Sequence, residues 1–356
     1  SGNLINELKF GSTKHTLLIG TEMIDTENSN LRHDTYWSTT QTDKESFFIT
    51  RPMDFSVNVD GVATSVDFAT NLKSKTESDI EVTSFYIQDQ IDVNESLKLM
   101  LGARVDTFDI TVKDIKSGTS QSREDDEVSP RAGIIFKPAE NISWYVSYSE
   151  SFLPRSGEQF KKLTADAARL DPDVFENTEF GVKWEITADL YFTAAYFDSE
   201  QIQAVRDSET GENSETVGLQ VDGFELELKG DVNEKLSIAI GVTSMDGETS
   251  SGGEPREIPD TQASLWTTYQ VNDRFGWGLG FTHQGKSNIN NNKSGLMLPD
   301  YTRVDFAVYY MISDEWNMQF NLENLTDELY FPHSHSTHQA SVGEPMNARI
   351  SIRRNF

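Results

Sequence analysis

Hydrophobic and polar residues alternate with a period of two along most of the chain. Between residues 97 and 105, every second side chain is Leu, Ala or Val, and the positions between them include Lys98 and Arg104. Residues 180–186 and 224–228 repeat the pattern, with Gly, Lys or Glu between the apolar side chains. Successive side chains of a β-strand point to opposite faces, so each segment predicts a strand with one apolar and one polar face.

This alternation predicts about fifteen strands and almost no helix. We place the strands at residues 3–10, 14–25, 81–92, 97–112, 128–138, 142–152, 176–186, 190–206, 217–230, 236–246, 260–271, 275–284, 299–312, 316–325 and 346–356. Many of them are longer than the five or six residues that are usual in globular proteins. The chain is therefore expected to be all-β.

The connections between these strands alternate between short and long. Short polar turns recur about every 45 residues, centred on Glu95, Glu140, Ala188, Glu234, Asp273 and Asp314. Longer Ser-, Asn-, Gly- and Asp-rich loops lie between them, at 113–126, 153–175, 284–297, 332–344 and, the longest, 26–80. Short turns at one end and long loops at the other predict an up-and-down antiparallel barrel. A propeller would share the repeat length but needs four short strands in each repeat.

Strand length separates a membrane barrel from a soluble sandwich, which also shows one-sided alternation. A tilted strand needs about nine to eleven residues to cross the bilayer. Aromatic side chains lie near the short turns, where an interfacial girdle is expected: Trp144, Tyr145, Trp184, Tyr191, Trp266, Tyr269, Trp277, Tyr309, Tyr310 and Trp316. The pattern thus favours an antiparallel up-and-down transmembrane β-barrel.

Composition narrows the function classes. The chain has 356 residues, no cysteine, and 58 acidic against 30 basic side chains, for a formal charge of −28. Disulfides and thiolate metal sites are excluded, and nucleic acid is disfavoured as a partner because phosphate contacts require clustered cations. The mean hydropathy of −0.51 argues against a transmembrane helix, but it does not detect barrel strands, whose apolar residues alternate with polar ones.

Several longer motifs are more specific than periodicity. They cover residues 15–20, 85–90, 129–138, 144–152, 175–184, 298–305 and 321–330, and the chain closes on alternating residues ending in Phe356. In this order they resemble the barrel of a TonB-dependent outer-membrane siderophore receptor. The segment Ser149-Glu-Ser-Phe-Leu-Pro-Arg-Ser-Gly157 most resembles the branch that takes up ferric catecholates.

The resemblance implies a larger protein than this chain. Such receptors carry a plug domain followed by a barrel of twenty-two strands, so residues 1–356 would be the C-terminal fifteen strands, without the plug. The expected location is the bacterial outer membrane, in contact with lipid and lipopolysaccharide. The expected partners are a ferric siderophore and, through the absent plug, the TonB complex. No cofactor is expected, since iron would enter only as part of the ligand.

Candidate ligand contacts are aromatic or cationic residues near the long loops, because siderophore complexes are bulky, usually anionic and often aromatic. They are Tyr36, Trp37, Phe47, Phe48 and Arg51 in the first long loop, Phe152, Arg155 and Phe160 after the Ser-Glu-Ser-Phe motif, Arg206, Phe331, and the cluster His333, His335 and His338. Arg155 is the best single choice, since it begins a long loop after the most family-like motif. For each single residue, a rim aromatic or an ordinary solvated cation is the more common role of such a side chain.

Three alternatives remain open. The three clustered histidines could hold a metal ion. However, no acidic or thiol side chain lies at a spacing typical of metal ligands, so no dedicated metal site is expected. The ligand could be another bulky nutrient: a different siderophore class, a cobalamin or an oligosaccharide. An outer-membrane hydrolase is less well supported, since the sequence has no Gly-x-Ser-x-Gly elbow and no nucleophile paired with a base.

The acidic charge opposes an anionic ligand. Acidic runs such as residues 123–127 offer one explanation, because divalent cations could bridge carboxylates to each other or to lipopolysaccharide. We state this as a hypothesis.

Overall fold

The computed structural model describes residues 1–34, 56–59, 62–65, 71–155, 160–206, 213–290, 295–336 and 339–355. Fifteen strands form one antiparallel sheet in chain order. They are β1 (Gly2–Phe10), β2 (Thr13–Asp34), β5 (Asn71–Asp92), β6 (Leu97–Asp114), β7 (Thr119–Ala139), β8 (Ile142–Leu153), β9 (Asp173–Thr187), β10 (Leu190–Arg206), β11 (Asn213–Asn233), β12 (Leu236–Thr249), β13 (Thr261–Asn272), β14 (Phe275–Gln284), β17 (Tyr301–Met311), β18 (Trp316–Glu323) and β21 (Asn347–Arg354).

Smaller elements lie in the connections. Three two-stranded hairpins pair β3 (Ser56–Val59) with β4 (Val62–Ser65), β15 (Ser287–Asn288) with β16 (Met297–Leu298), and β19 (His333–Ser336) with β20 (Gln339–Ser341). One 3-10 helix, η1, covers Ala167–Arg169. The described residues contain no helix long and apolar enough to cross a membrane.

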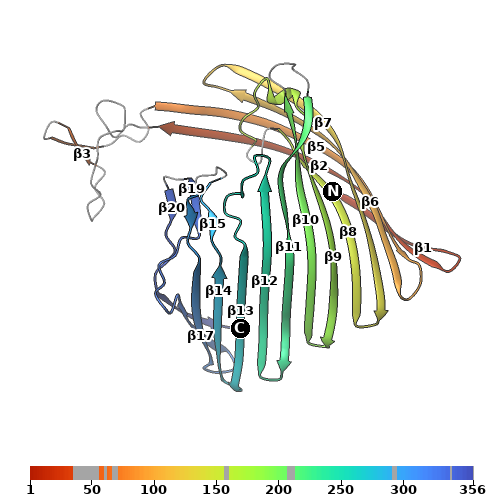
Figure 1. The fold of residues 1–356 in the computed structure, drawn as a ribbon, viewed down its shortest axis with the longest axis vertical. Coiled ribbons are helices and arrows are strands. Elements are labelled where there is room, and N and C mark those ends of the chain that lie inside the picture. The colour runs from red at the N-terminus through yellow and green to blue at the C-terminus, as the bar shows by residue number, and fades with distance from the viewer. Residues whose placement is uncertain are drawn as a thin grey trace.

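The predicted architecture is confirmed. All fifteen predicted strands are present, and each inner strand pairs with its neighbours in the sequence. Figure 1 shows one curved sheet in which β9 to β14 lie side by side along the long axis and β2 and β5 cross at the top. The predicted short turns join β5–β6, β7–β8, β9–β10, β11–β12, β13–β14 and β17–β18. We call this end of the strands the short-turn end and the opposite end the long-loop end.

The strand register divides the side chains between two faces. Directly opposed residues share a face, and successive residues alternate between faces. Tyr145, Glu225 and Trp266 lie on one of them and line a hollow of about 660 Å³; we call this the inner face. Phe85, Trp184 and Leu226 lie on the opposite, outer face and are 60%, 40% and 46% exposed. No second sheet covers these apolar residues in the described part of the chain, as lipid contact requires.

The structure confirms only part of the predicted aromatic girdle. The register places Trp144, Trp184, Tyr269, Trp277, Tyr310 and Trp316 on the outer face. However, it places Tyr145, Tyr191, Trp266 and Tyr309 on the inner face. Nearness to a turn does not determine which face a residue occupies, because that depends on its parity in the strand.

Strands β2, β5, β6 and β7 extend beyond their predicted ends, and in the extensions of β5 and β6 the outer face becomes polar and the inner face apolar. On the outer face, the pairs beyond Phe85–Val105 are polar: Thr83–Thr107, Glu81–Asp109 and Asp79–Thr111. On the inner face, the pairs beyond Ser84–Asp106 are apolar: Val82–Phe108 and Ile80–Ile110. The apolar outer band therefore ends at the level of Phe85, where the strands pass from lipid into water.

This exchange explains the error in the predicted loops. Residues 26–34 and 71–80 are strand, although they fall within the predicted loop 26–80, and most of the predicted loop 113–126 is also strand. The extensions carry acidic side chains on the outer face, so they lack the apolar-outside pattern of the membrane segments. Only residues 115–118 form the β6–β7 turn, where the Asp114 carboxylate accepts hydrogen bonds from the backbone N–H groups of Ser117 and Lys116. These bonds lower the pKa of Asp114.

Carboxylates line up across neighbouring strands just beyond the apolar band. We call this set the carboxylate belt: Asp25, Glu81, Asp109, Glu124, Glu150, Glu176, Glu200, Asp198, Asp222 and Asp246. The register opposes Asp25 to Glu81, Glu81 to Asp109 and Asp109 to Glu124. It continues with Glu150, Glu176 and Glu200 in one row, and with Asp198, Asp222 and Asp246 in another. Directly opposed residues are about 4.5–5.5 Å apart, so these like charges destabilise the sheet unless cations screen them.

The two faces can be tested with neighbouring residues of β11. Leu226→Arg places a charge on the lipid-facing side and is expected to cost about 2–4 kcal/mol. Glu227→Arg places the same side chain on the inner face and is expected to cost less than about 1 kcal/mol. Urea unfolding of the protein folded into phospholipid vesicles measures both values. Equal losses for the two variants would contradict the assignment of the faces.

Candidate functional site

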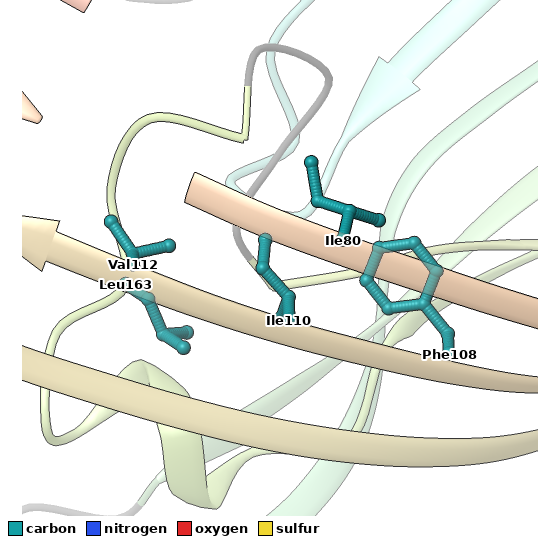
Figure 2. Packing of buried hydrophobic residues seen from close by; sticks show 5 residues of the cluster. All are labelled: Ile80, Phe108, Ile110, Val112 and Leu163. Carbon is teal, nitrogen blue, oxygen red and sulfur yellow. The ribbon is translucent and has the colours of Figure 1, made fainter. Parts of the chain in front are cut away.

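The β8–β9 loop folds back onto the inner face of the strand extensions. Leu163 of this loop is 7% exposed and packs against Ile80, Phe108, Ile110 and Val112. Figure 2 shows Leu163 next to Val112 and Ile110, with Ile80 and Phe108 completing the cluster. A segment of the same chain therefore covers the apolar inner surface of the strand extensions.

Polar contacts fix the same loop at further points. Arg123 of β7 donates from Nη1 to the carbonyl oxygen of Ala168 at 3.1 Å and forms an ion pair with Asp125. The Ser78 hydroxyl of β5 donates to the carbonyl oxygen of Phe160. At the base of the loop, Arg155 Nη1 lies 2.8 Å from Asp173 Oδ1, and both side chains are largely buried.

Three predicted site residues come together at the end of β8 and in this loop. Phe152 and Phe160 are partly buried against the Leu163 cluster, and the Phe160 ring lies 6.0 Å from that of Phe108. Arg155 also donates from Nε to the carbonyl oxygen of Asp171 at 2.5 Å, in addition to its ion pair. The structure thus brings the three residues together and gives Arg155 a role in closing the loop. Whether Arg155 also contacts a ligand stays a prediction.

A second group of loops lies at the long-loop end of the C-terminal strands. Glu257, from the β12–β13 connection, accepts a hydrogen bond from the backbone N–H of Ser334 at 2.5 Å. The Ser334 hydroxyl donates to the carbonyl oxygen of Ile289 at 3.0 Å. His333 is 76% exposed, with Nδ1 4.0 Å from Glu257 Oε1, and Phe331 is half-buried nearby in sequence. Three connections are therefore joined here, with His333 at their surface.

The remaining predicted site residues are not placed by the structure. Tyr36, Trp37, Phe47, Phe48, Arg51 and His338 lie outside the described residues. Arg206 is the last residue of β10 and His335 lies in β19, but their side chains are outside the description. Across the described ranges, no three potential ligating side chains are close enough to hold a metal ion.

One of the motifs that resemble the family, residues 321–330, has a structural role. Asn324, within residues 321–330, is buried at a backbone φ of +52°. Its side-chain amide donates to the carbonyl oxygens of Glu328 and Glu344 at 2.9 and 3.0 Å, and its oxygen accepts from the N–H of Glu328. Asn tolerates left-handed backbone better than most residues. Asn324 therefore ties the end of β18 to the segment before β21, a role that the motif alone did not indicate.

The hollow on the inner face has a wall of mixed polar and apolar side chains, and its charged residues are mainly acidic. Its wall includes Glu179, Glu225, Glu227 and Asp305. Arg303 Nη2 lies 2.9 Å from Asp305, and the Tyr145 hydroxyl donates to Glu179.

Trp266 lies flat across the wall of this hollow. A Cβ atom on Gly280 would come within 2.6 Å of the Trp266 ring, so glycine is needed beneath it. Aromatic, hydroxyl and carboxylate groups therefore face the aqueous side of the sheet.

Comparison with known proteins identifies the family. The model described as "TonB dependent receptor-like, beta-barrel" matches residues 5–325. Among curated proteins, "Probable TonB-dependent siderophore receptor PiuA" of Acinetobacter baumannii is 29% identical over 326 residues, covering 81% of this chain and 43% of the relative. The ferripyoverdine receptor of Pseudomonas aeruginosa is 25% identical over 378 residues, covering 99% of this chain and 44% of the relative.

Solved structures agree with this fold. The siderophore receptor PiuA from Acinetobacter baumannii superposes with a TM-score of 0.76 at 26% identity, over 98% of this chain and 54% of that chain. The ferric-catecholate import receptor Fiu from E. coli K12, in its closed form, gives a TM-score of 0.79 at 19% identity over 98% and 53%. The likeness to Fiu shows the fold alone.

The comparisons also bear on the enzyme alternative. This chain spans about half the length of the relatives and structures that it matches. The matched family contains transporters rather than hydrolases, which confirms the prediction that the protein is not an enzyme. The chain belongs to the TonB-dependent receptor-like β-barrel family, a family of outer-membrane receptors.

Proposed function

We propose that the intact protein binds and imports ferric siderophores across the outer membrane. The match of residues 5–325 to the receptor barrel family carries this proposal. It is supported by the 29% identity to a siderophore receptor and by the polar, aromatic inner face of the sheet. The chain spans about half of each relative, so transport is proposed for the longer protein.

We further propose that transport is coupled to the TonB complex through a plug outside this chain. The resemblance implies a barrel of twenty-two strands, and the lumen of such a barrel is an open pore unless a plug fills it. The acidic residues Glu179, Glu225 and Glu227 of the inner face would meet such a plug. Charge complementarity favours a basic plug surface opposite them.

For the ligand class, we propose a ferric catecholate. This rests on the resemblance of residues 149–157 to the catecholate branch. Relatives named for metal-pseudopaline, ferripyoverdine and ferrioxamine are 23%, 25% and 24% identical. Another siderophore class is therefore the alternative, and a cobalamin or an oligosaccharide is a more distant one.

Intrinsic fluorescence of the full-length receptor in detergent tests the ligand class. We expect quenching that saturates with ferric catecholates, because the sheet carries tryptophan on its inner wall. Iron-free catechol, cobalamin and oligosaccharide should leave the emission unchanged. Saturable quenching by cobalamin or oligosaccharide alone would contradict siderophore transport. Saturable quenching by ferric hydroxamates alone would retain the transport function and contradict the catecholate class.

We also propose that divalent cations bridge the carboxylate belt to lipopolysaccharide phosphates. The belt lies immediately beyond the apolar outer band, at the level where outer-leaflet head groups meet water. Opposed carboxylates attract cations more strongly than isolated ones, since each cation relieves repulsion between two charges.

Chelation tests this bridging in the receptor embedded in outer-membrane vesicles. We expect EDTA to lower the melting temperature by roughly 2–4 °C, the shift that about 1 kcal/mol produces. The variant Glu81→Gln/Asp109→Asn should melt with less dependence on EDTA. The matched variant Glu225→Gln/Glu227→Gln removes the same charge from the inner face and should keep the full EDTA effect. Melting of the unaltered receptor that EDTA does not change would rule out the bridging.

A further inference from the structure

Carboxylates gather on the inner face of β7, where the β8–β9 loop folds back onto the sheet. Asp125 and Glu127 are alternate residues of this strand, so they share a face. The register opposes Asp125 to Phe108 and Glu127 to Asp106, which places both on the inner face. Acidic side chains of two neighbouring strands therefore lie together beside the loop.

Asp125 is buried with one carboxylate oxygen unsatisfied. Its side chain is only 2% exposed, and both contacts that it receives from Arg123 end on Oδ1. Asp125 Oδ2 is buried and has no hydrogen-bond partner among the described residues. A buried acceptor without a donor costs free energy. A proton on a neighbouring carboxyl group would supply the missing donor.

Glu127 is the neighbouring group that can carry this proton. Burial raises the pKa of Glu127, and the negative charges of Asp125 and Asp171 raise it further, against the smaller opposing effect of Arg123. A protonated carboxyl group has an O–H to donate, whereas an ionised one only accepts. Glu127 can therefore serve as a donor to Asp125 only when it is protonated.

Acidic groups outnumber cationic groups on the elements packed around Glu127. The charged residues there are Asp106 and Arg104 on β6, Glu22 on β2, Arg123, Asp125 and Asp126 on β7, and Asp171 in the loop. Arg104 is already bonded to Asp106 at 2.8 Å and to Glu22 at 3.0 Å. An ionised Glu127 therefore adds to an excess of negative charge, which its protonated form avoids.

Part of this effect depends on the position of the loop. Arg123 holds the loop here, because Nη1 donates to the carbonyl oxygen of Ala168 at 3.1 Å and Nη2 lies 3.6 Å from Asp171 Oδ1. If residues 160–172 leave the inner face, Glu127 no longer experiences the charge of Asp171, and its pKa moves back towards its ordinary value. The closed loop and the protonated form of Glu127 therefore stabilise each other.

We propose that protonation of Glu127 controls whether the β8–β9 loop stays closed: the protonated carboxyl group donates to Asp125 Oδ2 and keeps residues 160–172 on the inner face, and loss of the proton favours their release. The proton stabilises the closed loop fully below the pKa that Glu127 has when the loop is open. This stabilisation is lost as the pH rises through the raised pKa of the closed state. The switch does not depend on which ligand the receptor imports.

Hydrogen–deuterium exchange of the full-length receptor in detergent tests this switch. After correction for the intrinsic pH dependence of amide exchange, opening of residues 160–172 should increase about threefold or more between about pH 5 and about pH 8. Glu127→Gln keeps an uncharged donor at this position, so its opening should be equally low at both pH values. The matched control Glu124→Gln removes a carboxylate from the outer face of the same strand and should keep the full pH dependence.

Two further measurements make the result decisive. Leu163→Ala removes the apolar anchor of the loop and should raise its opening at both pH values, which gives a reference for the released state. Exchange of β11 and β12 should be equal in all variants, since the sheet stays folded. Opening of the unaltered receptor that does not change with pH would overturn the proposal. A pH dependence that persists in Glu127→Gln would overturn it as well.

Discussion

Backbone hydrogen bonding inside lipid is the constraint on which this structure depends. A strand in the bilayer has no water to bond to, so its N–H and C=O groups must pair with neighbouring strands. Each strand from β2 to β18 in the sheet pairs on both sides. That pairing fixes the pleat, and the parity of each residue then decides whether it meets lipid or the aqueous interior. Polar groups collect on the inner face, where Arg104 contacts Asp106 at 2.8 Å and Glu22 at 3.0 Å.

Beyond the bilayer the same pleat supports the opposite arrangement. Burying the Leu163 or Ile110 side chain contributes about 1.5–3 kcal/mol. An opposed like-charge pair costs about 0.2–1 kcal/mol. The apolar inner cluster therefore outweighs the repulsion within the outer carboxylate belt, so the extensions remain strands. Hydrophobic burial of Leu163 also sets the position of the loop that covers this cluster.

The sequence predicted the sheet well because lipid imposes a strong contrast between alternate residues. It failed where that contrast ends: residues 123–127 are charged on both faces, which is typical of loops, although they belong to β7. The sequence placed the candidate residues Phe152, Arg155 and Phe160 close together along the chain, and the structure gathers them at the end of β8 and in the loop that follows. Their roles were not predictable, because the Arg155–Asp173 pair and the burial of Leu163 depend on how the loop folds back. A single leucine in a polar segment gives no periodic signal.

The acidic side chains of the chain lie in two groups that the sheet separates in space. Screening limits exposed charges to a range of about 8 Å at physiological salt. The carboxylate belt lies on the outer face, whereas Glu179, Glu225 and Glu227 lie on the inner wall. The sheet therefore separates the charges of the belt from a solute inside the lumen, but the acids of the inner wall face it. For the import that we propose, an anionic complex passing along this wall meets repulsion, so its passage requires an input of free energy.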